Sequence, residues 1–251
     1  MSDKRDFTGQ VAVVVGAGNG IGRASLGLLL ARGARVIAID NNQDALSRVQ
    51  AEFSLHDDQI FQLDVSDENK VRETIAAIFG AEKRIDALVN TAGMTGPTNR
   101  KLEDISWQEF EQTLRVNLFG AIWLTKQVIP IMKQQKYGRI VHVASIAGKE
   151  GNPGMAPYNT SKAGMIGFIK GIAKEIAPDG ITINAVAPAV IRTPMNAETS
   201  EETLKYMIAR IPMGRVGEAE EVAETIAFMA SKACSFTTGF TFDTSGGRAT
   251  Y

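Results

Sequence analysis

The fold of this chain is decided by the stretch Val11-Ala12-Val13-Val14-Val15-Gly16-Ala17-Gly18-Asn19-Gly20-Ile21-Gly22. Its first five residues form a continuous apolar run, which is typical of a parallel strand that is buried on both faces. A helical pattern follows from Ile21 to Arg32, and Gly33 stands where glycine commonly ends a helix. A strand, a glycine-rich turn and a helix in this order predict the first unit of a parallel α/β sheet.

The same alternation of apolar runs and amphipathic stretches continues along the chain. It predicts strands at 36–39, 60–63, 87–89, 140–144, 181–186 and 241–243, and helices at 44–53, 68–79, 107–132, 158–176 and 219–229. Residues 187–217 are interpreted as a long polar segment. Repeated units of this kind predict a Rossmann-type, doubly wound parallel sheet with helices on both faces. No linker or shift in composition divides the chain, so we expect a single domain over residues 1–251.

Composition excludes several classes of protein. The 27 basic and 28 acidic residues give a net charge of −1, and no basic block favours nucleic acid or an anionic membrane. The polar N-terminus lacks the apolar core of a signal peptide, and no run approaches the ~20 apolar residues of a membrane span. We therefore expect a soluble cytoplasmic protein.

The few cysteines and histidines argue against a metal site. Cys234 is the only cysteine, which excludes an intramolecular disulfide, and we interpret it as a small buried hydrophobe. Of the two histidines, His142 is interpreted as a packed strand residue and His56 as a solvated loop residue. We expect no catalytic metal.

The glycine turn and the acid that follows it predict a bound dinucleotide. Glycines let the backbone approach a pyrophosphate, whose charge then lies at the N-terminus of the helix. Asp40 closes the second strand about twenty residues later, where a carboxylate can bind the ribose hydroxyls of NAD. NADP is less expected, because Asp40 would repel its 2′-phosphate and neither Asn41 nor Asn42 can neutralise it. The alternative is that Asp40 merely caps the following helix.

A phenol and an ammonium group stand four residues apart in Tyr158-Asn159-Thr160-Ser161-Lys162. On a helix, such positions lie on one face. A free phenol titrates near 10, and a fixed cation lowers that pKa by favouring the phenolate. The spacing therefore suggests an acid–base pair, although a surface tyrosine and lysine at helical spacing are common.

These motifs resemble the short-chain dehydrogenase/reductase family over residues 9–247. The turn spacing G-x-x-x-G-x-G and the pair Tyr158 and Lys162 belong to this pattern. The other matching residues are Asp64, Asn90, Ala92, Gly93, Asn117, Ser145, Pro188 and Thr193.

The resemblance implies a role for each site residue. Ser145 would hold and polarise the substrate oxygen, and Tyr158 would be the acid–base group. Lys162 would bind the nicotinamide ribose and lower the pKa of the tyrosine, and Asn117 would anchor a water that links the lysine to solvent. The implied cofactor-binding residues are Gly16, Asn19, Gly20, Ile21, Gly22, Asp40, Asp64, Val65, Asn90, Ala92, Gly93, Tyr158, Lys162, Pro188, Val190, Ile191 and Thr193.

The sequence departs from the family pattern at three positions. Val15 replaces a common threonine, Thr91 replaces a common asparagine, and Ala189 follows Pro188 where glycine is usual. If that position required positive φ, alanine would cost about 1 kcal/mol.

The resemblance implies hydride transfer between NAD and a secondary alcohol or its ketone. Because the polar segment after Thr193 makes a poor wall for a long acyl chain, we expect a small polar substrate such as a hydroxy acid, sugar acid or polyol. One alternative is an NADPH-dependent 3-oxoacyl-acyl-carrier-protein reductase, which residues 151–154 resemble. Another is a catalytically silent module that senses dinucleotides.

Several further residues are candidates for the substrate site or for self-association. Arg100 and Lys149 are candidates to hold a carboxylate, and the tail 248–251 is a candidate to reach a neighbouring subunit. Residues 119–123 and 164–171 are apolar on more than one face, and by resemblance they predict a homotetramer. The remaining candidates near the cleft are Arg192, Arg210, Met195, Met207 and Met213.

Overall fold

The computed structural model describes residues 6–194 and 200–251. Its centre is a seven-stranded sheet in the order β3-β2-β1-β4-β5-β6-β9, in which every neighbouring pair is parallel. The strands are β1 (Val11–Val15), β2 (Arg35–Asp40), β3 (Ile60–Gln62), β4 (Ala87–Asn90), β5 (Gly138–Val143), β6 (Ile181–Pro188) and β9 (Thr241–Thr244). The short strands β7 (Ile191–Arg192) and β8 (Gly217–Glu218) form a separate pair.

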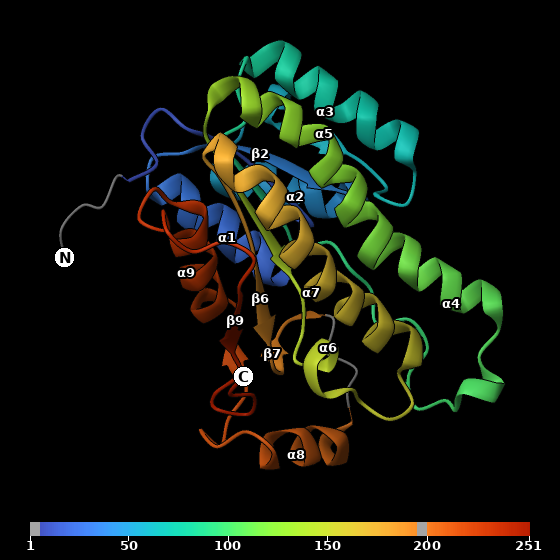
Figure 1. Cartoon of the computed structure of the whole chain (residues 1–251). Coiled ribbons are helices and arrows are strands. Elements are labelled where there is room, and N and C mark those ends of the chain that lie inside the picture. Colours follow the sequence, from blue (N-terminus) through green and yellow to red (C-terminus); the bar gives the residue numbers. More distant parts are fainter. Residues whose placement is uncertain (1–5, 195–199) are drawn as a thin grey trace.

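Helices cover both faces of this sheet (Figure 1). On one face lie α1 (Gly20–Ala31), α2 (Gln43–Phe53) and α9 (Ala219–Ala230). On the other face lie α3 (Glu68–Glu82), α5 (Gly120–Gln135) and α7 (Ala156–Ile176), and α4 (Trp107–Leu114) leads into α5. The short helices α6 (Ala147–Glu150) and α8 (Glu201–Ala209) lie near the carboxyl ends of the strands. The predicted doubly wound architecture is confirmed.

Strand β1 shows why its apolar run has to be continuous. Successive side chains of a strand point to opposite faces of the sheet. Val13 and Val15 therefore pack among the side chains of α3, α5 and α7, whereas Ala12 and Val14 pack among those of α1, α2 and α9. All four are buried, so a polar residue at any of them would lie in one of the two cores.

Besides the short elements α6, β7 and β8, which were not predicted, the structure differs from the predicted elements in two places. The segment 107–132 is interrupted by a π-helical stretch, Arg115–Phe119, between α4 and α5. Apolar spacing alone does not reveal such an insertion, which is frequent at functional sites. The prediction also missed α8 inside the polar segment, although Ser200 caps it by accepting a hydrogen bond from Thr203 N and acids occupy its first turn.

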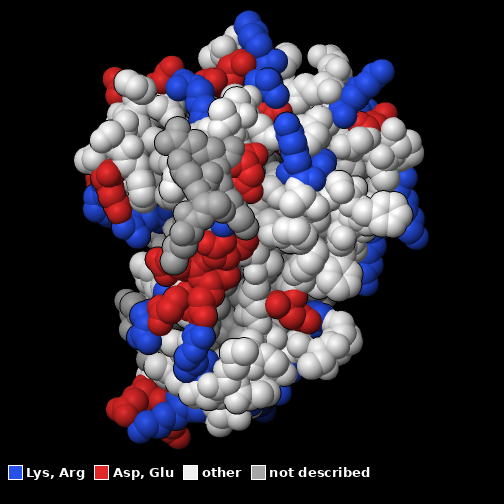
Figure 2. All heavy atoms as spheres, turned by 90° about the vertical axis from the view of Figure 1, so that its left-hand side faces the viewer, with Lys and Arg blue, Asp and Glu red and all other residues white. Residues whose placement is uncertain are grey.

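The surface agrees with the balanced composition. On the face that Figure 2 shows, basic side chains are scattered among acidic ones, and a group of acidic side chains occupies the middle. None of the helices described has the combination of length and apolar character that crossing a membrane requires.

Candidate active site

A large cavity opens where the order of the strands reverses. β1 lies between β2 and β4, so the connections after β1 and β4 leave in opposite directions, and open α/β sheets bind ligands at such a point. The cavity measures about 1060 Å³, at the upper end of the range for ligand pockets. It is lined by Gly16, Asn19, Gly20, Ile21, Gly22, Asp40, Asp64, Val65, Ala92, Gly93, Ser145, Tyr158, Lys162, Pro188, Val190, Ile191 and Thr193, among others.

The glycines of this turn leave space that side chains would fill. Gly16 and Gly20 have φ values of +79° and +50°, which favour glycine. A Cβ atom on Gly22 would lie 1.9 Å from the carbonyl oxygen of Gly16. The turn therefore brings bare backbone to the N-terminus of α1, where a pyrophosphate is stabilised by backbone N–H groups and by the helix dipole. These residues fit a dinucleotide.

Asp40 is held at the end of β2 with its carboxylate in the cavity wall. One oxygen, Oδ2, accepts a hydrogen bond from Gly18 N at 2.8 Å, and Oδ1 accepts one from Asn42 N at 3.0 Å. Asp40 is not the cap of α2, because Asn42 is the N-cap and its side chain accepts a hydrogen bond from Ala45 N. The alternative role considered for Asp40 is therefore wrong.

Asn90 lies behind the cavity wall and orders the loop that forms it. Its Oδ1 accepts a hydrogen bond from Ala92 N at 3.2 Å, and its Nδ2 lies 3.3 Å from Nδ1 of His142. On the other side of the imidazole, Nε2 lies 2.9 Å from Oγ1 of Thr125. That hydroxyl donates to Ala121 O, so it has to accept from the imidazole, and His142 carries its proton on Nε2.

His142 is thus a neutral residue that links the loop after β4 to α5. It is completely buried, and burial, aided by the charge of Lys162, lowers its pKa to about 3. The prediction that His142 is a packed residue is confirmed, and so is that of a buried Cys234. His56 is exposed, as predicted. The chain of hydrogen bonds through His142 has no counterpart in the sequence pattern.

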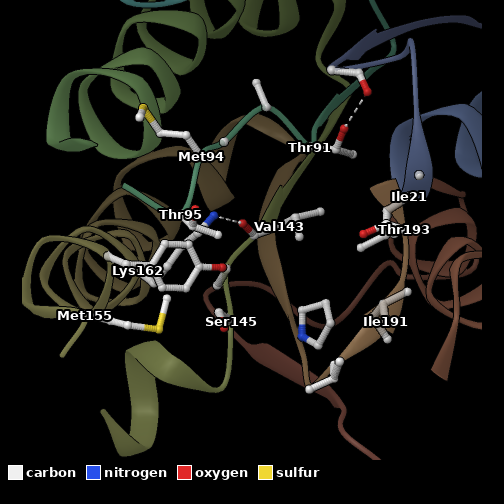
Figure 3. A pocket seen from close by; sticks show the side chains of 18 of the residues that line it. Ile21, Thr91, Met94, Thr95, Val143, Ser145, Met155, Lys162, Ile191 and Thr193 are labelled. Atoms are coloured by element: carbon white, nitrogen blue, oxygen red, sulfur yellow. Dashed lines mark hydrogen bonds between the residues drawn. The ribbon is translucent and has the colours of Figure 1, made fainter. Parts of the chain in front are cut away.

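Tyr158, Lys162 and Ser145 line one side of the cavity. Tyr158 and Lys162 lie on consecutive turns of α7, and Ser145 follows β5. Figure 3 shows the Lys162 amine directed at the carbonyl oxygen of Val143, which accepts its hydrogen bond at 2.7 Å. In the same view, Ile21 and Thr193 lie across the cavity from Lys162 and Ser145.

The electrostatics of this pair differ from the expectation. Burial raises the pKa of Tyr158, and its interaction with the Ser145 hydroxyl only opposes this rise. Burial also lowers the pKa of Lys162 to about 8. Its Nζ lies 5.6 Å from the centre of the Tyr158 ring and is bonded to Val143 rather than to the phenol. The expected lowering of the tyrosine's pKa by the lysine is therefore not found.

Asn117 is brought to the site by the π-helical stretch between α4 and α5. Its side chain is fully buried, and Oδ1 accepts a hydrogen bond from Met94 N at 2.8 Å. Its Nδ2 donates to Met94 O at 2.9 Å and to Ser161 Oγ at 3.0 Å. Asn117 therefore ties the loop after β4 to α7, next to Lys162.

The segment between Ser145 and Tyr158 is closed by contacts that the sequence did not suggest. Asn152 N donates to Asn159 Oδ1 at 3.1 Å, and Asn159 Nδ2 donates to Asn152 O at 2.8 Å. A Cβ atom on Gly148 would lie 2.6 Å from the backbone of Lys162, so α6 packs directly on α7. These contacts fix the position of Ser145 relative to Tyr158.

The three departures from the family pattern have local explanations. Thr91 Oγ1 donates to Val15 O at 2.8 Å and also lies 3.1 Å from Gly16 O, so the threonine closes the loop onto the glycine turn. Ala189 is not among the residues with positive φ, and the expected cost of a side chain there does not arise. Val15 is buried in the core.

Most of the predicted substrate cations are already paired. Arg100 pairs with Glu109, Arg192 with Glu218 and Lys149 with Asp243, and none of the three lines the cavity. Arg100 and Lys149 are therefore not placed to hold a substrate carboxylate. Arg210 and Arg248 line it.

The predicted methionines also differ in whether they line the cavity. Met207 lines the cavity, whereas Met213 does not and is 69% exposed. Met195 lies outside the described residues. Among the residues described, no group of three histidine, cysteine or acidic side chains is placed to hold a metal ion.

Comparison with known proteins identifies the family. The family model described as enoyl-(acyl carrier protein) reductase matches residues 16–249. The chain belongs to the short-chain dehydrogenase/reductase family. Its sequence is 41% identical over 245 residues to the 2-dehydro-3-deoxy-L-rhamnonate dehydrogenase (NAD(+)) of Sphingomonas sp. (strain SKA58), which covers 98% of this chain and 97% of the relative.

Other relatives in this short-chain dehydrogenase/reductase family are named for a different activity. The 3-oxoacyl-(acyl-carrier-protein) reductase of Synechocystis sp. (strain ATCC 27184 / PCC 6803 / Kazusa) is 41% identical over 248 residues, 96% of this chain and 97% of the relative. The crystal structure of gox2181 superposes with a TM-score of 0.93 at 33% identity and covers 98% of both chains. This protein is therefore an NAD(P)-dependent oxidoreductase that acts on CH–OH groups, and not a silent sensing module.

Proposed function

We propose that this enzyme uses NAD to interconvert a secondary alcohol and a ketone on a small polar substrate of the hydroxy acid, sugar acid or polyol type. The observation that carries the choice of cofactor is the carboxylate of Asp40, fixed in the cavity wall at the end of β2. When bound, the nicotinamide supplies or accepts the hydride at the carbon that carries the oxygen.

Charge at the adenosine end of the cavity supports NAD over NADP. A 2′-phosphate would approach Asp40 with like charge. Two arginines of the first βαβ unit are already paired, Arg23 with Glu52 and Arg35 with Glu82 and Asp58. The relative from Sphingomonas is also named for NAD(+). Charge-assisted hydrogen bonds to the ribose contribute about 1.5–3 kcal/mol, and together with the repulsion they favour NAD by about 100-fold or more.

We assign proton transfer to Tyr158 and orientation of the substrate oxygen to Ser145. The buried phenol is protonated at neutral pH, because burial raises its pKa, and it can therefore donate a proton to a developing alkoxide. Lys162 and Asn117 hold the arrangement in place through Val143, Met94 and Ser161. In the oxidation direction the same phenol accepts the proton, so oxidation is expected to become faster as pH rises.

Polar groups around the substrate half of the cavity support a small polar substrate. Asn152, Gln112 and Thr95 line it, together with Arg210 and Arg248. The name of the Sphingomonas relative also refers to a sugar acid. The second candidate is NADPH-dependent reduction of a 3-oxoacyl thioester, which the relative from Synechocystis, of equal identity, favours. Asp40 is the residue that argues against it.

One set of assays separates the two candidates. Hydroxy acids, sugar acids, polyols and 3-oxoacyl thioesters are tested with NAD(H) and NADP(H), and kcat/KM is followed at the nicotinamide absorbance. The expected result is turnover of an acid or polyol with NAD, and loss of most of the preference for NAD in Asp40→Ala. Better kcat/KM for a 3-oxoacyl thioester with NADPH would reject the proposal.

We also propose a homotetramer, in which α5 and α7 pair with their copies. In the monomer structure described, a Cβ atom on either Gly167 or Gly171 of α7 would meet no atom within 4 Å, so this helix has an open surface. Light scattering at micromolar concentration measures the mass. A monomer mass would reject the tetramer without affecting the proposed chemistry.

A further inference from the structure

The cavity contains a buried arginine for which the proposed chemistry has no use so far. Among the described residues, the basic side chains that line the cavity are Lys162, Arg210 and Arg248. Lys162 is committed to Val143 and stands beside Tyr158. Arg248 is only 5% exposed and comes from the last four residues of the chain. Its charge is paired with that of Glu150, as a buried charge requires.

The guanidinium of Arg248 is held at two points. Its Nε donates to Glu150 Oε2 at 3.0 Å. Its Nη2 lies 3.0 Å from the same carboxylate oxygen and donates to Asn152 Oδ1 at 3.2 Å. Its Nη1 has no hydrogen-bond partner among the described residues. A guanidinium has five N–H donors in a rigid plane, and Nε and Nη2 already have acceptors, so the two N–H groups of Nη1 remain as the open end for a ligand.

The C-terminal tail sets the position of this fork. Arg248 N donates to Ser245 O at 3.2 Å, and Ala249 N donates to Ser245 Oγ at 3.1 Å. Farther along, the Tyr251 hydroxyl donates to Lys149 O at 2.9 Å. The tail is therefore docked against the α6 segment of its own chain. A fork that is ordered in advance loses little entropy when it binds a ligand.

The contacts of Arg248 place it at the substrate half of the cavity. Glu150 and Asn152 follow Ser145 by five and seven residues, in the segment that connects Ser145 to Tyr158. The acids of the adenosine half, Asp40 and Asp64, stand at or beyond the ends of β2 and β3 instead. A group bound by Arg248 would thus belong to the substrate and not to the adenosine part of the cofactor.

We propose that Arg248 binds the carboxylate of the substrate and selects acids over neutral alcohols; this rests on the proposed function. Guanidinium groups donate charge-assisted hydrogen bonds to carboxylates, and the two N–H groups of Nη1 are available to donate them here. Glu150 does not line the cavity, and it orients the arginine from the side opposite the open end. Arg210 is the weaker candidate, because it is exposed at the C-cap of α8 and its only described side-chain partner is Tyr206 Oη at 3.5 Å.

The test compares an acid substrate with its uncharged analogue. The probes are the hydroxy acid or sugar acid with the highest kcat/KM in the assays above, and the primary amide of the same compound. They are measured with wild type, Arg248→Met, Arg248→Lys, Arg210→Met and Glu150→Gln. In Arg248→Met, kcat/KM for the acid is expected to fall about 100-fold, mainly through KM, because two charge-assisted bonds are lost. The kcat/KM for the amide stays within about threefold.

The control variants distinguish binding of the substrate by Arg248 from a purely structural role in docking the C-terminal tail. Arg248→Lys keeps the charge but not the fork and gives an intermediate loss. Glu150→Gln retains the preference for the acid, and so does Arg210→Met. Equal losses of kcat/KM for the acid and the amide in Arg248→Met would mean that Arg248 only holds the C-terminal tail in place, and would overturn the proposal. So would loss of the preference in Arg210→Met alone.

The outcome also distinguishes this inference from the proposed function. A wild type that prefers the acid, together with an Arg248→Met variant that keeps this preference, rejects only the role of Arg248. A wild type that does not prefer the acid rejects the acidic substrate class, and the role of Arg248 is rejected with it.

Discussion

Replacing His142 with glutamine is expected to make the stability of the protein less sensitive to acid. The imidazole is completely buried, accepts a hydrogen bond from Asn90 at Nδ1 and donates one to Thr125 from Nε2. A protonated imidazole would have to donate at both nitrogens, and Asn90 would then lose either this bond or its bond to Ala92. The folded protein therefore resists protonation of His142.

The sign and size of the effect follow from the pKa values. The pKa of His142 is lowered to about 3 in the folded protein, whereas histidine in an unfolded chain titrates near 6.5. As pH falls below 6.5, the unfolded chain binds a proton that the folded protein does not, so stability decreases until about pH 3. Between pH 7.5 and pH 5 the loss from this residue alone is about 2 kcal/mol.

Urea denaturation at pH 7.5 and pH 5, followed by tryptophan fluorescence, measures this loss. Wild type should lose about 2 kcal/mol more than His142→Gln, because glutamine can accept from Asn90 and donate to Thr125 without titrating. The carboxylates contribute to both proteins and cancel in the difference. His56 is the matched control, since it is exposed, and His56→Gln should lose as much as wild type. Equal losses in wild type and His142→Gln would refute the reasoning.

Three further results are expected. Tyr158→Phe should lower kcat by about 10²- to 10⁴-fold while dinucleotide binding, measured by fluorescence titration, is retained; full activity would remove the phenol from the chemistry. Gly22→Ala should abolish dinucleotide binding, because its Cβ would lie 1.9 Å from Gly16 O, whereas Gly80→Ala, which meets no atom within 4 Å, should bind normally. Lys162→Met should be inactive. Because the buried lysine has a pKa of about 8, the free energy of unfolding of wild type should rise by up to about 3 kcal/mol between pH 8 and pH 10.5, and Lys162→Met should lack this rise. A wild type with no such gain in denaturation curves would contradict that pKa.

The order of strands and helices was predictable from the sequence because it depends on local patterns. The run Val11 to Val15 has to be apolar throughout, since its side chains face two cores, and this shows in the sequence without any knowledge of its neighbours. The glycine turn is equally local, because close approach and positive φ act on the glycines themselves. The spacing of Tyr158 and Lys162 follows from the pitch of one helix.

The features of the site that the sequence did not predict depend on contacts between segments that lie far apart in the chain. The sequence placed Asn117 within a continuous helix, whereas a π-helical stretch directs its amide to Met94 and Ser161. It predicted a tyrosine with a lowered pKa, because spacing shows that a cation is near but not that burial dominates.

The substrate wall is the clearest case of a feature that only the tertiary structure decided. Among the candidate cations, the sequence favoured Arg100 and Lys149, and each is paired with an acid that the fold brings to it, Glu109 and Asp243. Arg248 enters the cavity because the C-terminal tail folds back onto a segment about 100 residues earlier in the chain. Ion pairs and burial depend on which surfaces meet, and no local pattern contains that information.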